Sequence, residues 1–423
     1  MDTAKINLYD MLLCLSSSVD LISPEVSTHH QQVAYLAFRL AEQMKLSKEE
    51  QRDILIAGML HDIGALTLSE RLALFEEEPI TINSHAYRSA KLLKEFEPFK
   101  AISETVRYHH VPWDYENGRK FMGKNVPLAS HLLYLADRTC ILIDKREDVL
   151  TQVPHILSHI NSKGNDRYMP QAVDALMALG KIEHIWLTLA YEAPLDYLPT
   201  VSMLDMINLD LDDLIHISKM FSHIIDFRSN FTATHSAGVA KTAQKLGEIA
   251  GFSNNECKML LVAGYLHDLG KLAIKNSLLE KPSALDEKEY IIIRSHTFYT
   301  YQLLNTIKDF QTINKWASFH HEKLNGNGYP FHLNGESIPL GSRIMAVADI
   351  FTAVTEHRPY RKGMEKDQVI RVLNSMVEDG SICPEVVSKL LKNFNLLTEI
   401  CNISQQQATY DYKQFFNDDV EIC

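Results

Sequence analysis

The hydrophobic positions of this chain recur mainly with the spacing of helices that bury one face. Within 239–249 apolar residues follow the i, i+3, i+4 rhythm, and 259–266 repeats it up to His267, with Gly270 as a helix stop. The stretch 205–225 reads as a further helix, joining two domains, while periodicity weakens from residue 395 onward. Alternating, strand-like patterns are scarce. The pattern therefore predicts an all-α protein built from helical bundles, with a short C-terminal tail.

An internal repeat organises these helices. When the sequence is displaced by 206 residues, 28–64 falls into register with 234–270, and both stretches carry a Leu-His-Asp-(Ile/Leu)-Gly motif. After a short insertion the match continues; its remaining pairs are Ser84-His85 with Ser295-His296, His109-His110 with His320-His321, and Asp137 with Asp349. Ten of the 19 histidines belong to this pattern. It predicts two homologous domains in tandem, at 1–200 and 201–395, followed by a tail at 396–423.

Composition and charge narrow the class of protein. The chain has 423 residues, of which 46% are hydrophobic and 23% charged, as in an ordinary globular protein. A formal net charge of −12 argues against binding long nucleic acids or anionic membranes. The apolar runs are shorter than a membrane span needs, and the N-terminus lacks a signal-peptide pattern. Six scattered cysteines without a C-x-x-C pair indicate reduced thiols, so we expect a cytoplasmic protein.

The repeated histidines and aspartates carry the candidate chemistry. A lone histidine is usually a surface or core residue, but here the spacing and the aspartate partners recur together. Each copy offers five imidazoles and two carboxylates, a nitrogen and oxygen set that suits Fe, Mn or Zn better than Ca or Mg. Seven ligands exceed one tetrahedral site and fit two metal ions, which can activate a bridging water for phosphate-ester hydrolysis. The second copy contributes His235, His267, Asp268, His296, His320, His321 and Asp349, and the first His29, His61, Asp62, His85, His109, His110 and Asp137.

The second copy has three further features that suit a phosphate substrate. Lys271 closes the His-Asp-Leu-Gly-Lys motif, where it can neutralise a phosphate beside the metals. A turn-rich loop with Gly328-Tyr329-Pro330 follows the histidine pair. Nine and twelve residues after Asp349 stand Arg358 and Arg361, whose guanidinium groups are natural phosphate clamps.

Taken together, these motifs resemble the HD-GYP subgroup of the HD superfamily over roughly residues 205–395. The resemblance implies a bacterial phosphodiesterase that opens cyclic dinucleotides, cyclic di-GMP above all or the mixed cyclic GMP-AMP, to the linear dinucleotide and in some relatives the mononucleotide. It also implies iron or manganese, a dimer, and a place in signal transduction with signalling-protein partners. By family pattern His235, His267, Asp268 and Asp349 hold one metal, and Asp268, His296, His320 and His321 the other. Asp268 and Lys271 would then be catalytic, and Lys271, Tyr329, Arg358 and Arg361 would contact substrate.

Both copies depart from the family pattern. Some members have a glutamate four residues before the first histidine, associated with a third metal; Phe231 stands there in the second copy, so we expect two metals. The first copy has Glu25 at that place, which adds a ligand to its candidate metal site, but Ala65 replaces the lysine. It also lacks the Gly-Tyr-Pro loop, and Arg146 is followed by no second arginine. We therefore expect the first domain to resemble a general HD domain that binds metal and serves a regulatory or packing role.

Three other interpretations remain open. HD ligands alone do not choose a substrate, so the enzyme could act on another nucleotide or phosphoester. A metal-dependent sensor could bind a cyclic dinucleotide without cleaving it, although such a copy should have lost ligands or Lys271. A di-iron oxygenase would leave the phosphate-binding residues unexplained.

Overall fold

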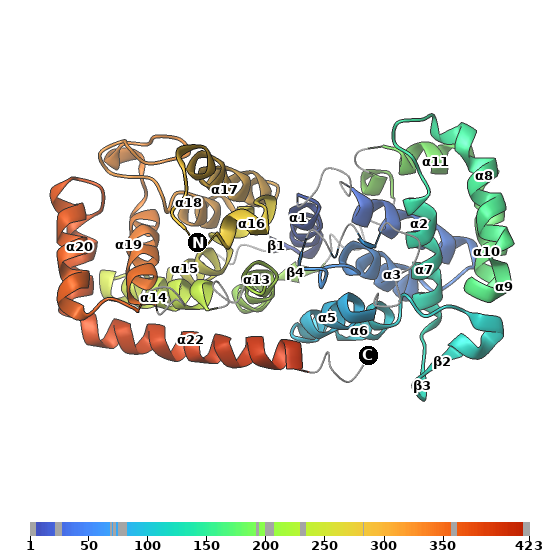
Figure 1. Cartoon of the computed structure of the whole chain (residues 1–423), viewed down its shortest axis with the longest axis horizontal. Coiled ribbons are helices and arrows are strands. Elements are labelled where there is room, and N and C mark those ends of the chain that lie inside the picture. The colour runs from blue at the N-terminus through green and yellow to red at the C-terminus, as the bar shows by residue number, and fades with distance from the viewer. Residues whose placement is uncertain are drawn as a thin grey trace. The chain divides into compact units, whose positions relative to one another are not determined.

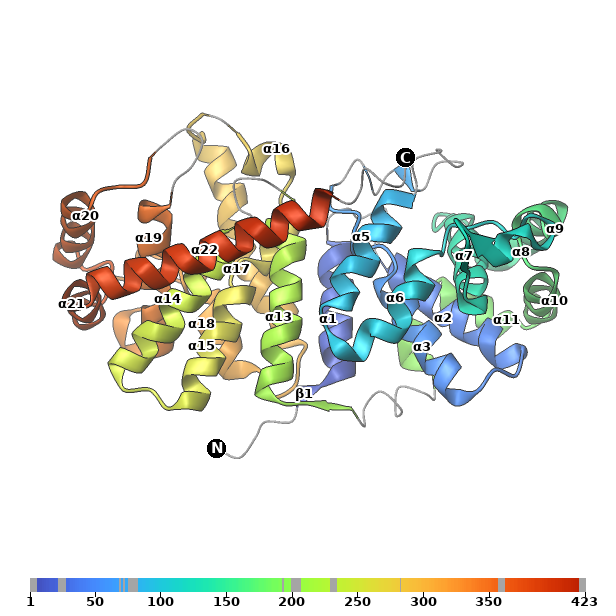
Figure 2. The same cartoon turned by 90° about the horizontal axis from the view of Figure 1, so that it is seen from below.

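The computed structural model describes residues 6–21, 28–67, 70, 73–74, 83–191, 194–198, 207–228, 234–281, 283–356 and 362–417. These residues are largely helical, as predicted, and form two compact units, Asn7–Ile207 and Asn208–Asn417 (Figures 1 and 2). None of their helices combines the length and apolar character needed to cross a bilayer. Cys14, Cys140, Cys257, Cys383 and Cys401 are buried, and none of them forms a disulfide with another described residue.

The N-terminal unit consists of helices connected by short 3-10 turns and one small hairpin. After strand β1 (Ile6–Asn7), its elements are α1 (Leu8–Asp20), α2 (His29–Gln43), α3 (Lys48–Leu60), α5 (Asn83–Lys94), η2 (Glu97–Phe99), α6 (Lys100–Arg107), η3 (Asp114–Arg119), β2 (Lys120–Phe121), β3 (Lys124–Asn125), α7 (Leu128–Ile141), α8 (Val149–Ser162), α9 (Gly164–Arg167), α10 (Pro170–Leu179), α11 (Glu183–Leu189) and η4 (Pro194–Tyr197). Strands β2 and β3 pair antiparallel, with Lys120 opposite Asn125.

The C-terminal unit repeats the same succession and extends it. Its elements are β4 (Asn208–Leu209), α13 (Leu211–Asp226), α14 (His235–Ala250), α15 (Asn254–Leu266), η5 (Leu269–Ala273), α16 (Asn276–Leu279), α17 (Glu287–Asn305), α18 (Gln311–Ser318), η6 (Gly335–Ser337), α19 (Leu340–Thr355), α20 (Lys366–Glu378), α21 (Pro384–Lys392) and α22 (Phe394–Asn417). Helices α13, α14, α15, α17, α18 and α19 correspond to α1, α2, α3, α5, α6 and α7 of the first unit.

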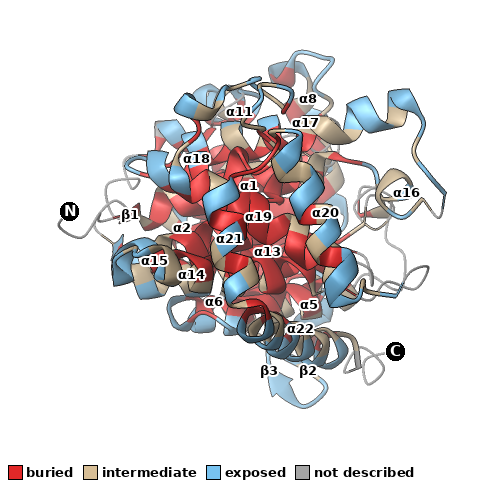
Figure 3. Cartoon of the chain, turned by 90° about the vertical axis from the view of Figure 1, so that its left-hand side faces the viewer, coloured by how far each residue is buried: buried red, intermediate tan, exposed pale blue. Residues whose placement is uncertain are grey.

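Each unit is organised around a central buried helix. Helix α2 packs against α3 and α7, and its counterpart α14 packs against α15, α19 and α22. The predicted face of α14 is buried, since Val239, Ala243 and Leu246 are fully inaccessible. In Figure 3, α19 is coloured mainly as buried, whereas α20 carries many exposed residues.

The repeat extends to the details that fix the helix pairs. Helices α3 and α15 begin with equivalent capping boxes, in which the Ser47 and Ser253 side chains accept from the backbone N–H three residues later. A Cβ added at Gly264 would lie 2.3 Å from Cα of Ala240, so only glycine lets α14 and α15 approach this closely. Gly58 plays the same part in the first unit, with Ala34 Cα at 2.5 Å.

The C-terminal segment differs from the short tail expected from residue 396. Residues 394–417 form the long helix α22, which packs along α14 as part of the C-terminal unit. The weak periodicity has a physical explanation: the helix buries a narrow stripe, formed by Leu397, Cys401, Ala408 and Phe415, and leaves most other positions to solvent.

Candidate metal centres

The C-terminal unit brings all seven predicted ligands of the second copy into one buried cluster. His235 is the first residue of α14, His267 caps the C-terminus of α15 with Asp268 directly after it, and His296 lies on α17. His320 and His321 follow α18, and Asp349 lies on α19. Six of the seven ligands are buried and His321 is intermediate in exposure. The helix ends are thus responsible for the convergence: they turn adjacent residues of the His-Asp pair toward the same centre.

The cluster divides into two halves that share Asp268. Ligand atoms of His235, His267 and Asp268 lie within 4.8 Å of one another, and so do those of His296, His320 and His321. Asp268 Oδ2 is 3.2 Å from His267 Nε2, while its Oδ1 is 3.5 Å from His296 Nε2. Because the two oxygens face different halves, this carboxylate is placed to bridge two ions.

Three imidazoles of the cluster are held in the same tautomer. The Nδ1 atoms of His267, His296 and His320 lie 2.7, 2.6 and 2.6 Å from the carbonyl oxygens of Gly264, Ile293 and Ala317. When Nδ1–H donates to a carbonyl, Nε2 keeps its lone pair and points into the cluster, as a metal ligand must. His267 Nε2 is buried and makes no hydrogen bond with any described residue. An orphaned acceptor of this kind fits a metal ion.

The ionisation of most of these groups favours the form that binds a metal, and His235 is the exception. Burial lowers the pKa of His296 to about 3 and that of His321 to about 4, so both are neutral near pH 7. Burial opposes charge on Asp268 as well, but His267 and Lys271 outweigh it and hold its pKa well below the usual range. In His235 the same desolvation is outweighed by Asp349 and Glu356, which raise its pKa to about 10. Metal binding at His235 therefore has to displace a proton.

Lys271 lies beside the shared carboxylate of the cluster. Its Nζ is 2.5 Å from Asp268 Oδ2. Gly270, expected to stop the helix, lies instead within η5, after α15 has ended at Leu266. A Cβ at this glycine would lie 1.9 Å from the His296 carbonyl oxygen, so the residue permits close packing of η5 on α17 rather than ending a helix.

Two buried carboxylates behind the ligands were missed by the sequence analysis. Glu356 Oε2 lies 3.7 Å from His235 Nδ1, and its Oε1 accepts hydrogen bonds from Thr234 Oγ1 at 2.7 Å and Gln405 Nε2 at 3.3 Å. Asp226 accepts a bond from Ser236 Oγ at 3.0 Å, and burial raises its pKa to about 7. The sequence contains a pattern from which each could have been predicted. Glu356 lies two helical turns after the ligand Asp349, and Asp226 is aligned with Asp20 in the internal repeat.

The Gly-Tyr-Pro loop is held in place beside the metal ligands by hydrogen bonds. The buried Glu322 accepts backbone N–H groups of Phe331 at 2.7 Å and Leu333 at 2.9 Å, which fixes the end of the loop. The Tyr329 ring consequently lies 4.9 Å from the His321 ring, centroid to centroid. Phe231, Arg358 and Arg361 lie outside the described residues, so their predicted places stay predictions.

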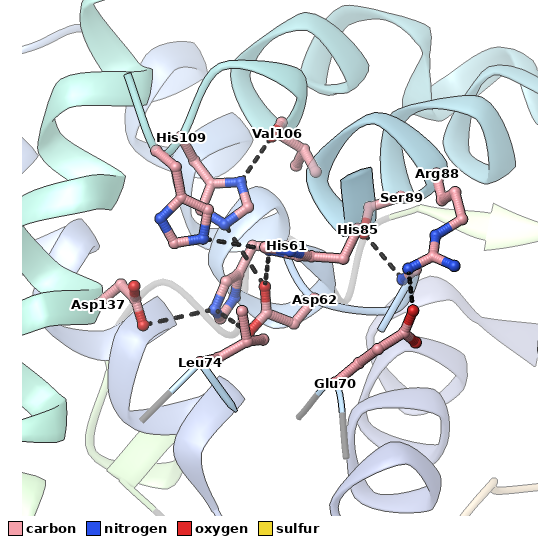
Figure 4. A network of polar contacts seen from close by, with 12 residues as sticks. His61, Asp62, Glu70, Leu74, His85, Arg88, Ser89, Val106, His109 and Asp137 are labelled. Atoms are coloured by element: carbon pink, nitrogen blue, oxygen red, sulfur yellow. Dashed lines mark hydrogen bonds and ion pairs between the residues drawn. The ribbon is translucent and has the colours of Figure 1, made fainter. Parts of the chain in front are cut away.

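The N-terminal unit assembles the equivalent cluster, seen in Figure 4. Asp62 again faces both halves: Oδ2 is 3.2 Å from His61 Nε2, and Oδ1 is 3.1 Å from His85 Nε2. One ligand group comprises Asp62, His85, His109 and His110, and the other His29, His61 and Asp137. His61 and His109 donate through Nδ1–H to the carbonyl oxygens of Gly58 and Val106, as in the second copy. Glu25 lies outside the described residues.

The cations of the two clusters differ. Ala65 takes the place of Lys271, and positive charge arrives from Arg138, whose Nε and Nη2 lie 3.0 and 2.8 Å from Asp137 Oδ2. Arg146 is exposed and donates to Asp144 at 2.6 Å. In the first copy the cation is therefore paired with the ligand of one half, not with the shared carboxylate.

Comparison with known proteins agrees with this architecture. Models of the HD domain match residues 219–386 and, separately, residues 26–141. The chain contains two HD domains. The HD resemblance drawn from the motifs is thereby confirmed for both copies, as is the all-α fold.

The chain is similar over most of its length to curated proteins of Vibrio cholerae serotype O1. It is 29% identical to 3'3'-cGAMP-specific phosphodiesterase 1 over 398 residues, 92% of either chain. It is 35% identical over 180 residues to the cyclic di-GMP phosphodiesterase response regulator RpfG of Xanthomonas campestris pv. campestris, which covers 42% of this chain and 47% of that protein. The crystal structure of the V. cholerae cyclic GMP-AMP phosphodiesterase V-cGAP3 shares the fold, with a TM-score of 0.65 at 23% identity over 93% of this chain and 99% of that one.

Proposed function

We propose that the C-terminal HD domain is a metal-dependent phosphodiesterase that hydrolyses a cyclic dinucleotide, 3'3'-cGAMP or cyclic di-GMP, to the linear dinucleotide. The observation that carries this proposal is the complete ligand set around a shared carboxylate, with Lys271 on that carboxylate and Tyr329 beside His321. The relatives named as 3'3'-cGAMP and cyclic di-GMP phosphodiesterases support the substrate class.

Two divalent ions fit the residues. His235, His267, Asp268 and Asp349 would hold one, and Asp268, His296, His320 and His321 the other. When bound, the ions supply Lewis-acid charge and an activated water for attack on phosphorus. The ligand atoms are nitrogen and carboxylate oxygen, which suit Fe, Mn or Zn better than Ca or Mg; the resemblance to the HD-GYP subgroup favours iron or manganese.

The protein's own residues position the substrate and balance its charge. The Lys271 ammonium on Asp268 adds a positive charge where negative charge develops on the phosphate in the transition state. Tyr329 forms a wall beside His321 and limits how the diester can lie. Arg358 and Arg361 would clamp phosphate oxygens from the segment that follows Glu356.

For the N-terminal domain we propose metal binding without hydrolysis of cyclic dinucleotides. Its ligands converge as in the second copy, but the lysine and the Gly-Tyr-Pro loop are absent from its sequence. A regulatory or packing role suits such a domain. We further propose a cytoplasmic homodimer that works with other signalling proteins; light scattering of the purified chain tests the dimer.

The deciding experiment measures hydrolysis of cyclic di-GMP and 3'3'-cGAMP by anaerobically purified protein whose metal content is counted. We expect turnover of at least one substrate, with about two ions in the C-terminal domain. Metal-replete protein that cleaves neither would contradict the proposal and favour another phosphoester substrate. If it binds a cyclic dinucleotide without cleaving it, the sensor interpretation gains support.

A further inference from the structure

One face of helix α17 combines two exposed aromatic side chains with a half-buried arginine beside the metal cluster. Tyr290, Arg294 and Phe298 are spaced i, i+4, i+8, so they follow one another along the same side of the helix. Tyr290 and Phe298 are 49% and 41% exposed. The Gly-Tyr-Pro loop extends this face, since the Phe331 ring, itself 37% exposed, lies 6.4 Å from the Phe298 ring. We call Tyr290, Arg294, Phe298 and Phe331 the α17 strip.

Arg294 connects the strip to the ligands. Its guanidinium carbon lies 4.7 Å from the centroid of the Tyr329 ring, and the same ring lies 4.9 Å from the ring of the ligand His321. Among the described residues no carboxylate pairs with Arg294. A guanidinium that lies over a ring but lacks an anionic partner keeps N–H donors available for a ligand.

We propose that the α17 strip binds a guanine base of the substrate and that Arg294 reads its O6 and N7 atoms. Aromatic rings and guanidinium planes are the surfaces on which unpaired bases stack in protein sites. Guanine presents two acceptors, O6 and N7, that match two parallel N–H donors of arginine, whereas adenine presents a donor at N6. The strip thus makes Arg294 a specificity-determining residue. This inference rests on the proposed function, since it places one base of the same cyclic dinucleotide.

The position of the strip suits this task better than a second phosphate clamp. Lys271 and the ions that the cluster would hold already balance the phosphate charge, and the bases must point away from the centre when the diester faces those ions. Only the Tyr329 side chain lies between Arg294 of the strip and the ligand His321. The other three members of the strip are aromatic rings, as base stacking requires.

The test uses the full metal-loaded protein with Arg294→Gln, Arg294→Lys and the exposed Arg371→Gln on α20 as a matched control. We expect Arg294→Gln to lower kcat/KM for 3'3'-cGAMP and cyclic di-GMP by roughly 10- to 100-fold, the value of a bidentate base contact. Arg294→Lys should recover only part of the lost kcat/KM, because one ammonium cannot reproduce the two parallel N–H donors of a guanidinium. Hydrolysis of bis(p-nitrophenyl) phosphate, which has no base, should change less than twofold in each variant. Equal losses on both kinds of substrate would overturn the inference and assign Arg294 to phosphate binding or to structure.

Binding of mononucleotides separates this inference from the proposed function. We expect the wild-type protein to bind GMP more tightly than AMP in calorimetric titrations, and Arg294→Gln to abolish that preference. This outcome would support the base contact even if neither cyclic dinucleotide were hydrolysed. A wild-type protein without preference, or a variant that keeps it, would overturn the contact even if hydrolysis is confirmed. A loss of dimerisation in Tyr290→Ala with unchanged base preference would instead assign the strip to contact with a second copy, and would also overturn it.

Discussion

Lys271 and Asp268 form the closest cation–carboxylate pair of the C-terminal metal centre, with Nζ 2.5 Å from Oδ2. In the N-terminal centre Ala65 replaces the lysine, and Arg138 pairs instead with Asp137. Two clusters with equivalent ligands thus differ in where they place their positive charge. Since the shared carboxylate faces both halves of the cluster, we attribute the difference in proposed activity to this cation and to the loop around Tyr329.

Replacement of Lys271 tests that attribution. Lys271→Ala should lower hydrolysis of a cyclic dinucleotide about a hundredfold or more, because loss of one preorganised charge-stabilising donor costs about that much. The number of bound ions should not change, since the lysine is not a ligand. Steady-state kinetics together with metal analysis measure both effects. A variant that loses its metals in parallel would show that Lys271 maintains the centre rather than stabilising the transition state.

The two shared carboxylates form a matched pair of substitutions. Asp268→Ala should remove the C-terminal ions and reduce hydrolysis about a thousandfold or more, because both ions lose a ligand. Asp62→Ala should remove metal only from the N-terminal domain and leave hydrolysis nearly unchanged. Metal counts and turnover of each variant, with circular dichroism to show folding, provide the measurement. If Asp62→Ala abolished turnover, the N-terminal domain would have a catalytic or strongly coupled role.

Much of this arrangement could be predicted because rare residues recur. Histidines at fixed spacing identified both copies, and the ligand positions converge as expected in each. The helix that follows His235 and the helix that ends before His267 could be predicted from apolar periodicity, since their buried faces are wide.

The remaining features depend on tertiary packing. The stripe of α22 is too narrow to stand out in a sequence, although Leu397 and Cys401 are buried. The role of Gly270 follows from the approach of η5 to α17, which involves residues 26 positions apart in the chain. In the sequence nothing connects Glu356 to His235. Their proximity depends on the fold, in which Thr234 and Gln405 donate hydrogen bonds to the Glu356 carboxylate.

Glu356 should therefore act as a positioning residue for a ligand. Its carboxylate faces His235 Nδ1, so it orients the ring and increases the basicity of Nε2. Glu356→Gln should weaken metal affinity about 10- to 100-fold, the usual range for such outer partners. Competition with a chelator measures it. Gln405→Ala, which removes only one hydrogen bond to Glu356, should have a smaller effect; an equal effect would point to helix α22 packing rather than to the carboxylate.

A histidine away from both centres should make stability depend on pH. His131 on α7 is 2% exposed and packs edge-on against Trp113, with ring centroids 5.0 Å apart. Burial disfavours its charged form and lowers its pKa from 6.5 to about 4. Between these values the unfolded chain binds a proton that the folded chain excludes. The free energy of unfolding must therefore fall as pH decreases from about 6.5 toward 4, and this contribution is fully present only above 6.5.

Replacing His131 with an apolar residue removes this proton uptake. When the pH falls from 7.5 to 5, the free energy of unfolding should decrease by about 2 kcal/mol less in His131→Leu than in the wild type. Each pH unit over which only the unfolded chain binds the proton contributes about 1.4 kcal/mol. Urea denaturation at the two pH values measures the difference. Both proteins contain the same metal ligands, so the titration of those ligands cancels. The exposed His155→Gln on α8 should follow the wild type. If His131→Leu also followed it, His131 would be protonated in the folded protein, and the packing against Trp113 would have to accommodate the charge.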